Sequence, residues 1–338
     1  MAVNLLSLNI NNLHTRMGHL RLTKKGVELL SLGVENTTNE FFSNINEVTA
    51  KQQSDVIKEL YTNLNIKAHE VSVIIPDSMT YSQILIMPNL KEEELVKSIR
   101  LQADEFIPLP IDEVYIDIEV ISQLEDNKLL VLIVASQKKF VDHISRTLEI
   151  IGLEPHSLEN ELSSLGRFVS EVFKPSKEPS IIINFGYEGS SIYLVNPALP
   201  HFQLTRTTNI GLEIIARDIK INFGWNDEQT FDALKKIGFS SSGSVNLYSL
   251  VYPVFNELLV EIEKTLLQAR NKHNVSVKNI YMFNYDNYIG SNHSVIQTKT
   301  SLPTAPFPLQ SFVIKNPITK AFNDSLSSFV SVIAGHIR

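Results

Sequence analysis

The chain has 338 residues and a formal net charge of −7, with 43% apolar and 20% charged residues. At roughly 150 residues per domain this length allows two lobes, and the composition excludes a disordered or fibrous protein. The negative charge, without a basic stripe to offset it, argues against a nucleic-acid partner. The absence of cysteine excludes disulfides, thiol catalysis and zinc–thiolate sites, and it fits a reducing compartment.

No segment has the pattern of a membrane anchor. The longest aliphatic run, residues 129–135, is much shorter than the roughly 20 residues that a spanning helix needs. The N-terminal residues lack the charged region, apolar stretch and cleavage site of a signal peptide. We therefore expect no direct membrane insertion, so a partner must hold the chain if it works at a membrane.

Two parts of the chain share one order of elements: three short strands joined by turns, an amphipathic helix, and a buried strand. In the first part these are expected at residues 3–10, 19–23, 27–32, about 56–64, and 71–75. In the second part they are expected at residues 180–184, 191–195, 202–207, about 211–223, and 279–283. The repeated order predicts a duplicated α/β fold with lobes at 1–174 and 175–338, joined by a linker at 174–179.

Each predicted lobe carries an insertion. In the first lobe, at about 88–152, the pattern is helix–strand–strand–helix, with Pro108 and Pro110 ending the first helix. In the second lobe, at about 225–275, the periodicity indicates helices. Asn316 followed by Pro317 is the N-cap signature of a C-terminal helix.

Sequence motifs of catalysis are missing. The nine histidines form no metal-binding pair, and neither a Gly-x-Ser-x-Gly elbow nor a Walker phosphate loop is present. Glu188 and Asp286 are single carboxylates near turns, which are far more often solvated than catalytic. The sequence therefore favours a binding role over an enzyme.

The hairpin turns that open the two lobes occupy equivalent positions in the repeat. In a duplicated fold such turns face each other, their N–H groups can cradle phosphates, and a carboxylate at each strand end can hold magnesium. Here Asn9 and Asn184 occupy both carboxylate positions, and a neutral amide cannot supply that charge. The paired turns therefore predict a vestigial nucleotide site.

Residues 99–114, IRLQADEFIPLPIDEV, form the most family-specific stretch of the chain. They resemble the pattern of the PilM family, a helix ending in Glu-Ala-x-x-Tyr/Phe-Ile-Pro-Phe-Pro followed by Asp-Glu-Val. Shorter matches in the same order lie at residues 76–78, 87–88, 209–211, 222–224 and 334–338. PilM proteins are cytoplasmic actin-like proteins of type IV pilus assembly, related to the cell-division protein FtsA. The resemblance implies a duplicated two-lobed fold of the actin, FtsA and Hsp70 type.

The departures from that family concern the nucleotide motifs. Asn9 and Asn184 stand where Asp is usual, Leu212 replaces the second glycine after Gly211, and a lysine replaces an expected arginine. The resemblance implies a degenerate nucleotide cleft formed by Asn9, Asn11, Asn12, Asn184, Gly186, Gly189, Gly211 and Lys264. No cofactor is expected, although weak binding of ATP or ADP with magnesium stays open.

The resemblance also implies a partner. PilM-like proteins hold the cytoplasmic N-terminal tail of PilN, an inner-membrane protein, in a groove between the core of the first lobe and its insertion. The residues expected to border that groove are Gln102, Phe106, Ile107 and Pro108. A pilus motor or other inner-membrane platform proteins are further possible partners. The implied location is the cytoplasm, at the inner face of the membrane through a partner.

Two alternatives remain open at this point. A functioning actin-like ATPase is disfavoured because two charge losses at a metal site would each remove several kcal/mol of transition-state stabilisation. An FtsA-like filament-forming protein is disfavoured because no amphipathic membrane-binding helix follows Gly335.

Overall fold

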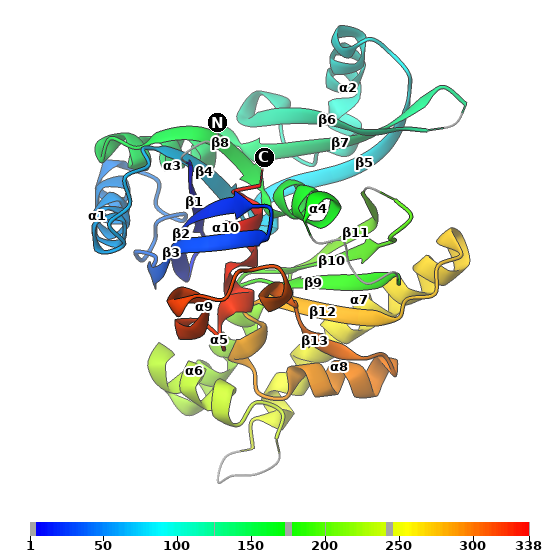
Figure 1. Cartoon of the computed structure of the whole chain (residues 1–338). Helices are drawn as coiled ribbons and strands as arrows, with labels where there is room; N and C mark the ends of the chain where they lie inside the picture. The colour runs from blue at the N-terminus through cyan, green and yellow to red at the C-terminus, as the bar shows by residue number, and fades with distance from the viewer. Residues whose placement is uncertain (1–4, 125, 173–177, 200, 241–245, 338) are drawn as a thin grey trace.

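The computed structural model describes residues 5–124, 126–172, 178–199, 201–240 and 246–337. The start of the first predicted strand, residues 3–4, and most of the predicted linker, residues 174–177, lie outside this part of the chain. The described strands form two five-stranded sheets and one three-stranded sheet (Figure 1).

The first sheet has the order β3-β2-β1-β4-β8. Its first three strands form an antiparallel meander, and its last two run parallel to β1. The bounds are β1 Leu5–Ile10, β2 His14–Thr23, β3 Gly26–Asn36, β4 Glu70–Ile75 and β8 Glu154–Asn160. All six residues of β1 are buried, as expected of a central strand covered on both faces.

The second sheet repeats this arrangement in the order β11-β10-β9-β12-β13. Again three strands are antiparallel and two are parallel to the central strand. The bounds are β9 Ser180–Phe185, β10 Ser190–Val195, β11 Phe202–Thr208, β12 Asn279–Asn284 and β13 Thr304–Pro306. The predicted repeat of sheet order is confirmed. The outer strands β8 and β13 were not predicted, because one is largely polar and the other has three residues.

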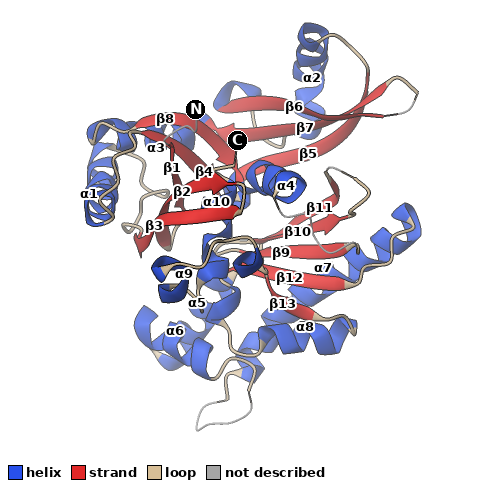
Figure 2. Ribbon diagram, viewed as in Figure 1, coloured by secondary structure: helices blue, strands red, loops and turns tan. Residues whose placement is uncertain are grey.

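Helices cover the outer faces of both sheets and fill the space between them. Helices α1 Glu47–Asn63 and α3 Lys138–Ile150 pack on the first sheet, and α5 Leu212–Phe223 and α7 Tyr248–His273 pack on the second. The inner faces share one core with α4 Glu161–Glu171 and α10 Val330–Ala334. Figure 2 shows these two helices between the sheets. Helices α6 Asp227–Lys236 and α8 Asn292–Thr300 pack on the core of the second sheet, and α9 Pro317–Ala321 contacts β3.

The three-stranded sheet has the order β5-β7-β6 and is antiparallel throughout. It consists of β5 Thr80–Pro88, β6 Val114–Leu124 and β7 Lys128–Gln137, and α2 Glu92–Phe106 packs on one of its faces. Strand β5 was not predicted, and α3, expected to end the insertion, packs beside α1 instead. The order here is therefore strand–helix–strand–strand, while the boundaries of the two lobes stay a prediction.

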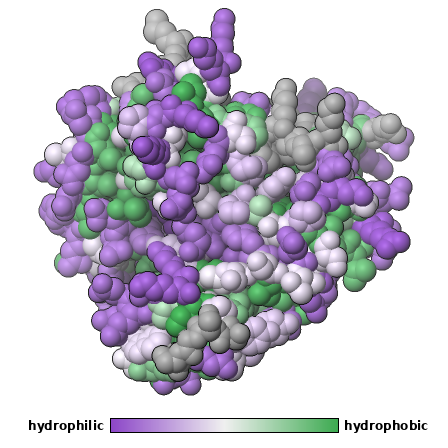
Figure 3. Space-filling view, turned by 60° about the horizontal axis from the view of Figure 1, so that its bottom comes forward, coloured by the Kyte–Doolittle hydropathy of each residue, from purple (hydrophilic) through white to green (hydrophobic). Residues whose placement is uncertain are grey.

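The surface is mostly polar on the face shown in Figure 3, where apolar residues appear in small separate groups. Across the described residues, none of the helices combines the length and the apolar character needed to cross a membrane.

Candidate functional site

The turn after β1 is organised by the side chain of Asn11. Its Oδ1 accepts the backbone N–H groups of Leu13 and His14, at 3.0 and 2.9 Å. The same oxygen accepts the hydroxyl of Tyr285 at 2.9 Å, and Tyr285 follows β12 in the second sheet. The first of the two predicted turns is thus tied across the interface between the sheets.

The equivalent turn after β9 requires close backbone contacts. A Cβ on Gly186 would lie 2.3 Å from the carbonyl oxygen of Gly189, and one on Gly211 would lie 2.1 Å from that of Tyr187. The first N–H groups of α5, from Leu212 and Glu213, donate to the carbonyls of Gly186 and Tyr187. The N-terminus of α5 is therefore satisfied by the turn itself.

A chain of buried hydrogen bonds joins the strand ends of both sheets. Arg16 Nη1 donates to Asn284 Oδ1 at 2.7 Å, and Asn284 Nδ2 donates to Asn184 Oδ1 at 2.9 Å. Asn184 Nδ2 then donates to Glu161 Oε2 at 2.6 Å. Asn9 lies beside Arg16 on the neighbouring strand, and its Nδ2 donates to the carbonyl of Ile74. Asn184 is thus part of this buried chain of bonds, whereas Asn9 lies beside it and its Oδ1 has no hydrogen-bond partner among the described residues.

Two buried carboxyl groups, Asp77 and Glu161, lie next to this network. Asp77 accepts the backbone N–H of Leu162 at 3.0 Å and the hydroxyl of Tyr193, and its own N–H donates to Glu161 at 3.3 Å. Glu161 also accepts the hydroxyl of Ser331 at 2.8 Å. Burial raises the pKa of Asp77, and burial together with the Asp77 charge raises the pKa of Glu161 to about 7.

The ring of Tyr285 fills the space beside the first turn. It stacks on His14 with 5.6 Å between ring centroids, and the guanidinium of Arg16 lies 4.5 Å from its centroid. Its hydroxyl lies 3.0 Å from His14 Nδ1. Burial, Arg16 and Lys235 lower the pKa of His14 to about 3, so this imidazole is neutral at physiological pH.

Little room remains between the two turns. The cavity there has a volume of about 10 Å³, which is enough for about one water molecule, whereas ligand sites typically offer several hundred Å³. Glu188 occupies the opening, where it accepts the N–H of Asn12 and the hydroxyl of Ser78, each at 3.3 Å. Nowhere in the described residues do three or more acidic or histidine side chains gather as a metal site. In this arrangement the residues do not fit a nucleotide with magnesium.

Most residues predicted for the cleft lie together. Asn11, Asn184, Gly186 and Gly189 line the cavity, and Asn12 donates its N–H to Glu188, which also lines it. Gly211 lies against the backbone of Tyr187 in the cavity wall, and Asn9 lies outside this lining, beside Ile74 on the neighbouring strand. Lys264 lies apart: its side chain is 55% exposed, and its ammonium group pairs with Glu261 on the same helix at 2.7 Å. The helical spacing of three residues favours that pairing over a reach into the cleft.

Arg16, Glu188 and Tyr285 were not among the residues that the sequence predicted for the cleft. Arg16 carried a signal, because it is a charged residue within a run of buried positions in β2. Glu188 and Tyr285 carried none, because their partners lie more than 100 residues away in sequence.

A second candidate site is an open groove between α4 and the face of the three-stranded sheet that α2 leaves uncovered. It has a volume of about 330 Å³. Ile84, Ile121 and Leu132 contribute apolar side chains, and Glu119 and Glu171 contribute charge at its edge.

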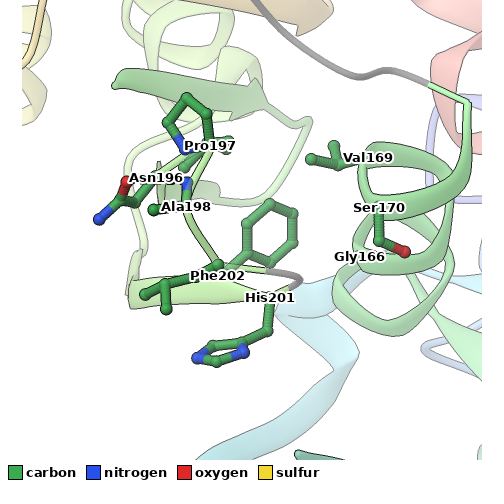
Figure 4. Close-up of a pocket in the computed structure, with 10 residues that line it drawn as sticks. Gly166, Val169, Ser170, Asn196, Pro197, Ala198, His201 and Phe202 are labelled. Carbon is green, nitrogen blue, oxygen red and sulfur yellow. Dashed lines mark hydrogen bonds between the residues drawn. The ribbon is translucent and has the colours of Figure 1, made fainter. Parts of the chain in front are cut away.

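The groove continues into a cavity of about 360 Å³ between α4 and the turn from β10 to β11. Gly166, Ser170, His201 and Phe202 line both spaces. Figure 4 shows the ring of Phe202 between Val169 on α4 and the turn at residues 196–198.

Of the residues predicted to border a partner groove, Ile107 and Pro108 are described, and neither lines this one. Ile107 is 3% exposed and packs with Leu95 and Ile99 in the core under α2. Because alternate residues of a strand point to opposite faces, Val131 belongs to that core while Leu132 lines the groove. Ile107 is therefore a core residue of the insertion. Pro108 is exposed, and the side chains of Gln102 and Phe106 lie outside the described part of the chain.

Two sheets with one strand order, a polar cleft between their turns and a shared helical core define an actin-like protein. The solved structure titled "PilM-PilN type IV pilus biogenesis complex" matches with a TM-score of 0.82 and 17% identity, over 100% of this chain and 99% of that one. The ethanolamine utilization protein EutJ from Carboxydothermus hydrogenoformans matches with a TM-score of 0.51 and 9% identity, over 98% and 88%.

The sequence model of the type IV pilus assembly protein PilM matches residues 7–315. The chain therefore belongs to the PilM family of type IV pilus assembly proteins, as the stretch at residues 99–114 predicted.

Proposed function

We propose that this chain is an assembly-platform protein of a type IV pilus or related type IV filament machine. It binds the cytoplasmic N-terminal tail of a PilN-like inner-membrane protein, and through that tail it is held at the inner face of the cytoplasmic membrane. The observation that carries the proposal is the open, apolar-floored groove between α4 and the three-stranded sheet. Membership of the PilM family and the partner named in the similar complex support it.

The chemistry of the groove suits a short apolar segment. Ile84 and Ile121 are only partly covered by the core beneath them, so an incoming side chain removes apolar surface from water on both partners. Each anchored side chain contributes roughly 1.5–3 kcal/mol. Two such anchors are enough for micromolar binding once the cost of ordering the tail is subtracted.

The test is calorimetric titration of a synthetic peptide from the partner's N-terminus. Ile121→Asp places a charge in the apolar floor, and we expect a loss of affinity of at least tenfold. Leu101→Asp is the matched control, because Leu101 is 86% exposed on α2, away from the groove, and its affinity should equal that of the wild type. Unchanged binding by a folded Ile121→Asp variant would show that the tail binds elsewhere.

We further propose that the chain is not an ATPase. Asn9 and Asn184 lack the charge that holds magnesium, and the cavity between the turns has room for about one water molecule. Purified protein should therefore release no phosphate from ATP above background, with or without magnesium. Steady turnover that disappears in Asn184→Ala would contradict this proposal.

A further inference from the structure

We propose that Glu188, Arg16 and Tyr285 occupy the cleft in place of a bound ligand, and so join the two sheets without a nucleotide. This inference concerns the cleft alone and goes beyond the binding of a partner tail in the groove.

Glu188 supplies the anion. It lies on the turn after β9, yet its carboxylate reaches across to the first sheet. There Oε1 accepts the N–H of Asn12 from the turn after β1, and Oε2 accepts the hydroxyl of Ser78 after β4. Backbone N–H groups of such turns are anion-binding positions. A side chain of the second sheet thus takes the position that the first turn offers to an anion.

Arg16 supplies the cation. Its side chain is 2% exposed and lies beside Asn9, at the strand ends where a metal would need carboxylates. A guanidinium keeps its charge when buried, and it here binds Asn284, which is linked through Asn184 to Glu161. Next to this cation, the neutral amides of Asn284 and Asn184 each accept one hydrogen bond and donate one along the chain to Glu161.

The ring of Tyr285 fills the space beside the turn after β1. The residue is fully buried between His14 and Arg16, and its hydroxyl binds Asn11 of the first turn. Tyr285 directly follows β12 of the second sheet, whereas these three contacts come from the first sheet and its turn, so the ring bridges the sheets.

The experiment is chemical rescue of Glu188→Ala. Thermal unfolding is followed in sodium acetate and in sodium chloride of equal ionic strength. Removing the carboxylate should lower the melting temperature, and acetate should raise it again by about 2 °C more than it does for wild type, because a small anion enters the vacated site. Glu28→Ala is the matched control. Glu28 is a half-buried acid on β3, away from the cleft, and it pairs with Arg21 on β2. Equal effects of acetate on all three proteins would overturn the inference.

A second measurement covers the case in which Glu188→Ala does not fold. In Glu188→Gln the charge is lost but the shape is kept, and we expect the amide of Asn12 to exchange its hydrogen about tenfold faster than in wild type. Unchanged exchange would overturn the inference, as would stabilisation of the wild type by magnesium and ATP. The affinity for the partner tail is measured on the same Glu188 variants. It should be unchanged, because the groove lies away from the cleft, so a failure of the cleft inference can be told apart from a failure of the proposed tail binding.

Discussion

The cleft between the two turns and the groove beside α4 differ in what fills them. The cleft is lined by buried polar groups that are bonded to one another across the sheets, whereas the groove presents partly exposed apolar side chains. Most buried polar groups in proteins have a partner, and here the chain itself supplies partners for Arg16, Asn184 and Asn284. An apolar surface left open is a common mark of a binding site. The cleft is therefore closed by contacts within the protein, whereas the groove is the open apolar surface that we propose as the site of the partner tail.

The largest effect on stability is expected at the cleft. Tyr285→Ala removes a fully buried ring that bridges the sheets, and such truncations typically cost about 3–5 kcal/mol of unfolding free energy. Urea denaturation measures it. Tyr248→Ala is the control, because Tyr248 is 40% exposed on α7, and it should cost much less. Equal losses of unfolding free energy in Tyr285→Ala and Tyr248→Ala would show that Tyr285 does not join the two sheets.

Gly211, which lies against the backbone of the turn after β9, should tolerate no side chain. A Cβ at Gly211 meets the backbone of Tyr187, which cannot move without breaking the bonds to α5. We expect Gly211→Ala to lower the unfolding free energy by about 1–3 kcal/mol, measured by denaturation. A neutral result would mean that the turn adjusts freely, contrary to a tightly filled cleft.

The acid pair behind the cleft should make stability depend on pH. Glu161 keeps its proton up to about pH 7 when folded but loses it near pH 4.5 when unfolded, so the folded state binds more protons between these values. Stability therefore falls as pH rises through this window, by at most about 1.4 kcal/mol per unit. Glu161→Gln should flatten this slope between pH 5 and 7. Parallel curves for the two proteins would show that Glu161 titrates normally.

The smallest effect, with the opposite sign, is expected at the groove. Gly166 lies inside α4, and a Cβ there meets only Phe202, at 3.7 Å. Alanine is favoured over glycine in a helix by up to about 1 kcal/mol, so Gly166→Ala should be neutral or stabilising. A loss comparable with that of Gly211→Ala would indicate that the groove is as tightly packed as the cleft.

Prediction from sequence worked best where the information was local. Strands β9, β10 and β12 and helix α5 were predicted within a few residues, because apolar periodicity and turn residues determine them. Strand β5 was missed since its residues are mostly half-buried and show no alternation. Of the residues that line the cleft cavity, the asparagines and glycines Asn11, Asn184, Gly186 and Gly189 were predicted, whereas Lys264 lies apart because it pairs with Glu261 on the surface of α7.

The sequence by itself determined the repeated order of strands and helices and the PilM family. Only the tertiary structure decided that Glu188, Arg16 and Tyr285 meet in the cleft and that Ile107 lies under α2, on the face of its sheet opposite the groove. The physical reason is that a cleft is made of contacts between residues up to 274 apart in the chain. A local sequence pattern determines which secondary structure each segment prefers. It does not determine which side chain fills the space between two segments.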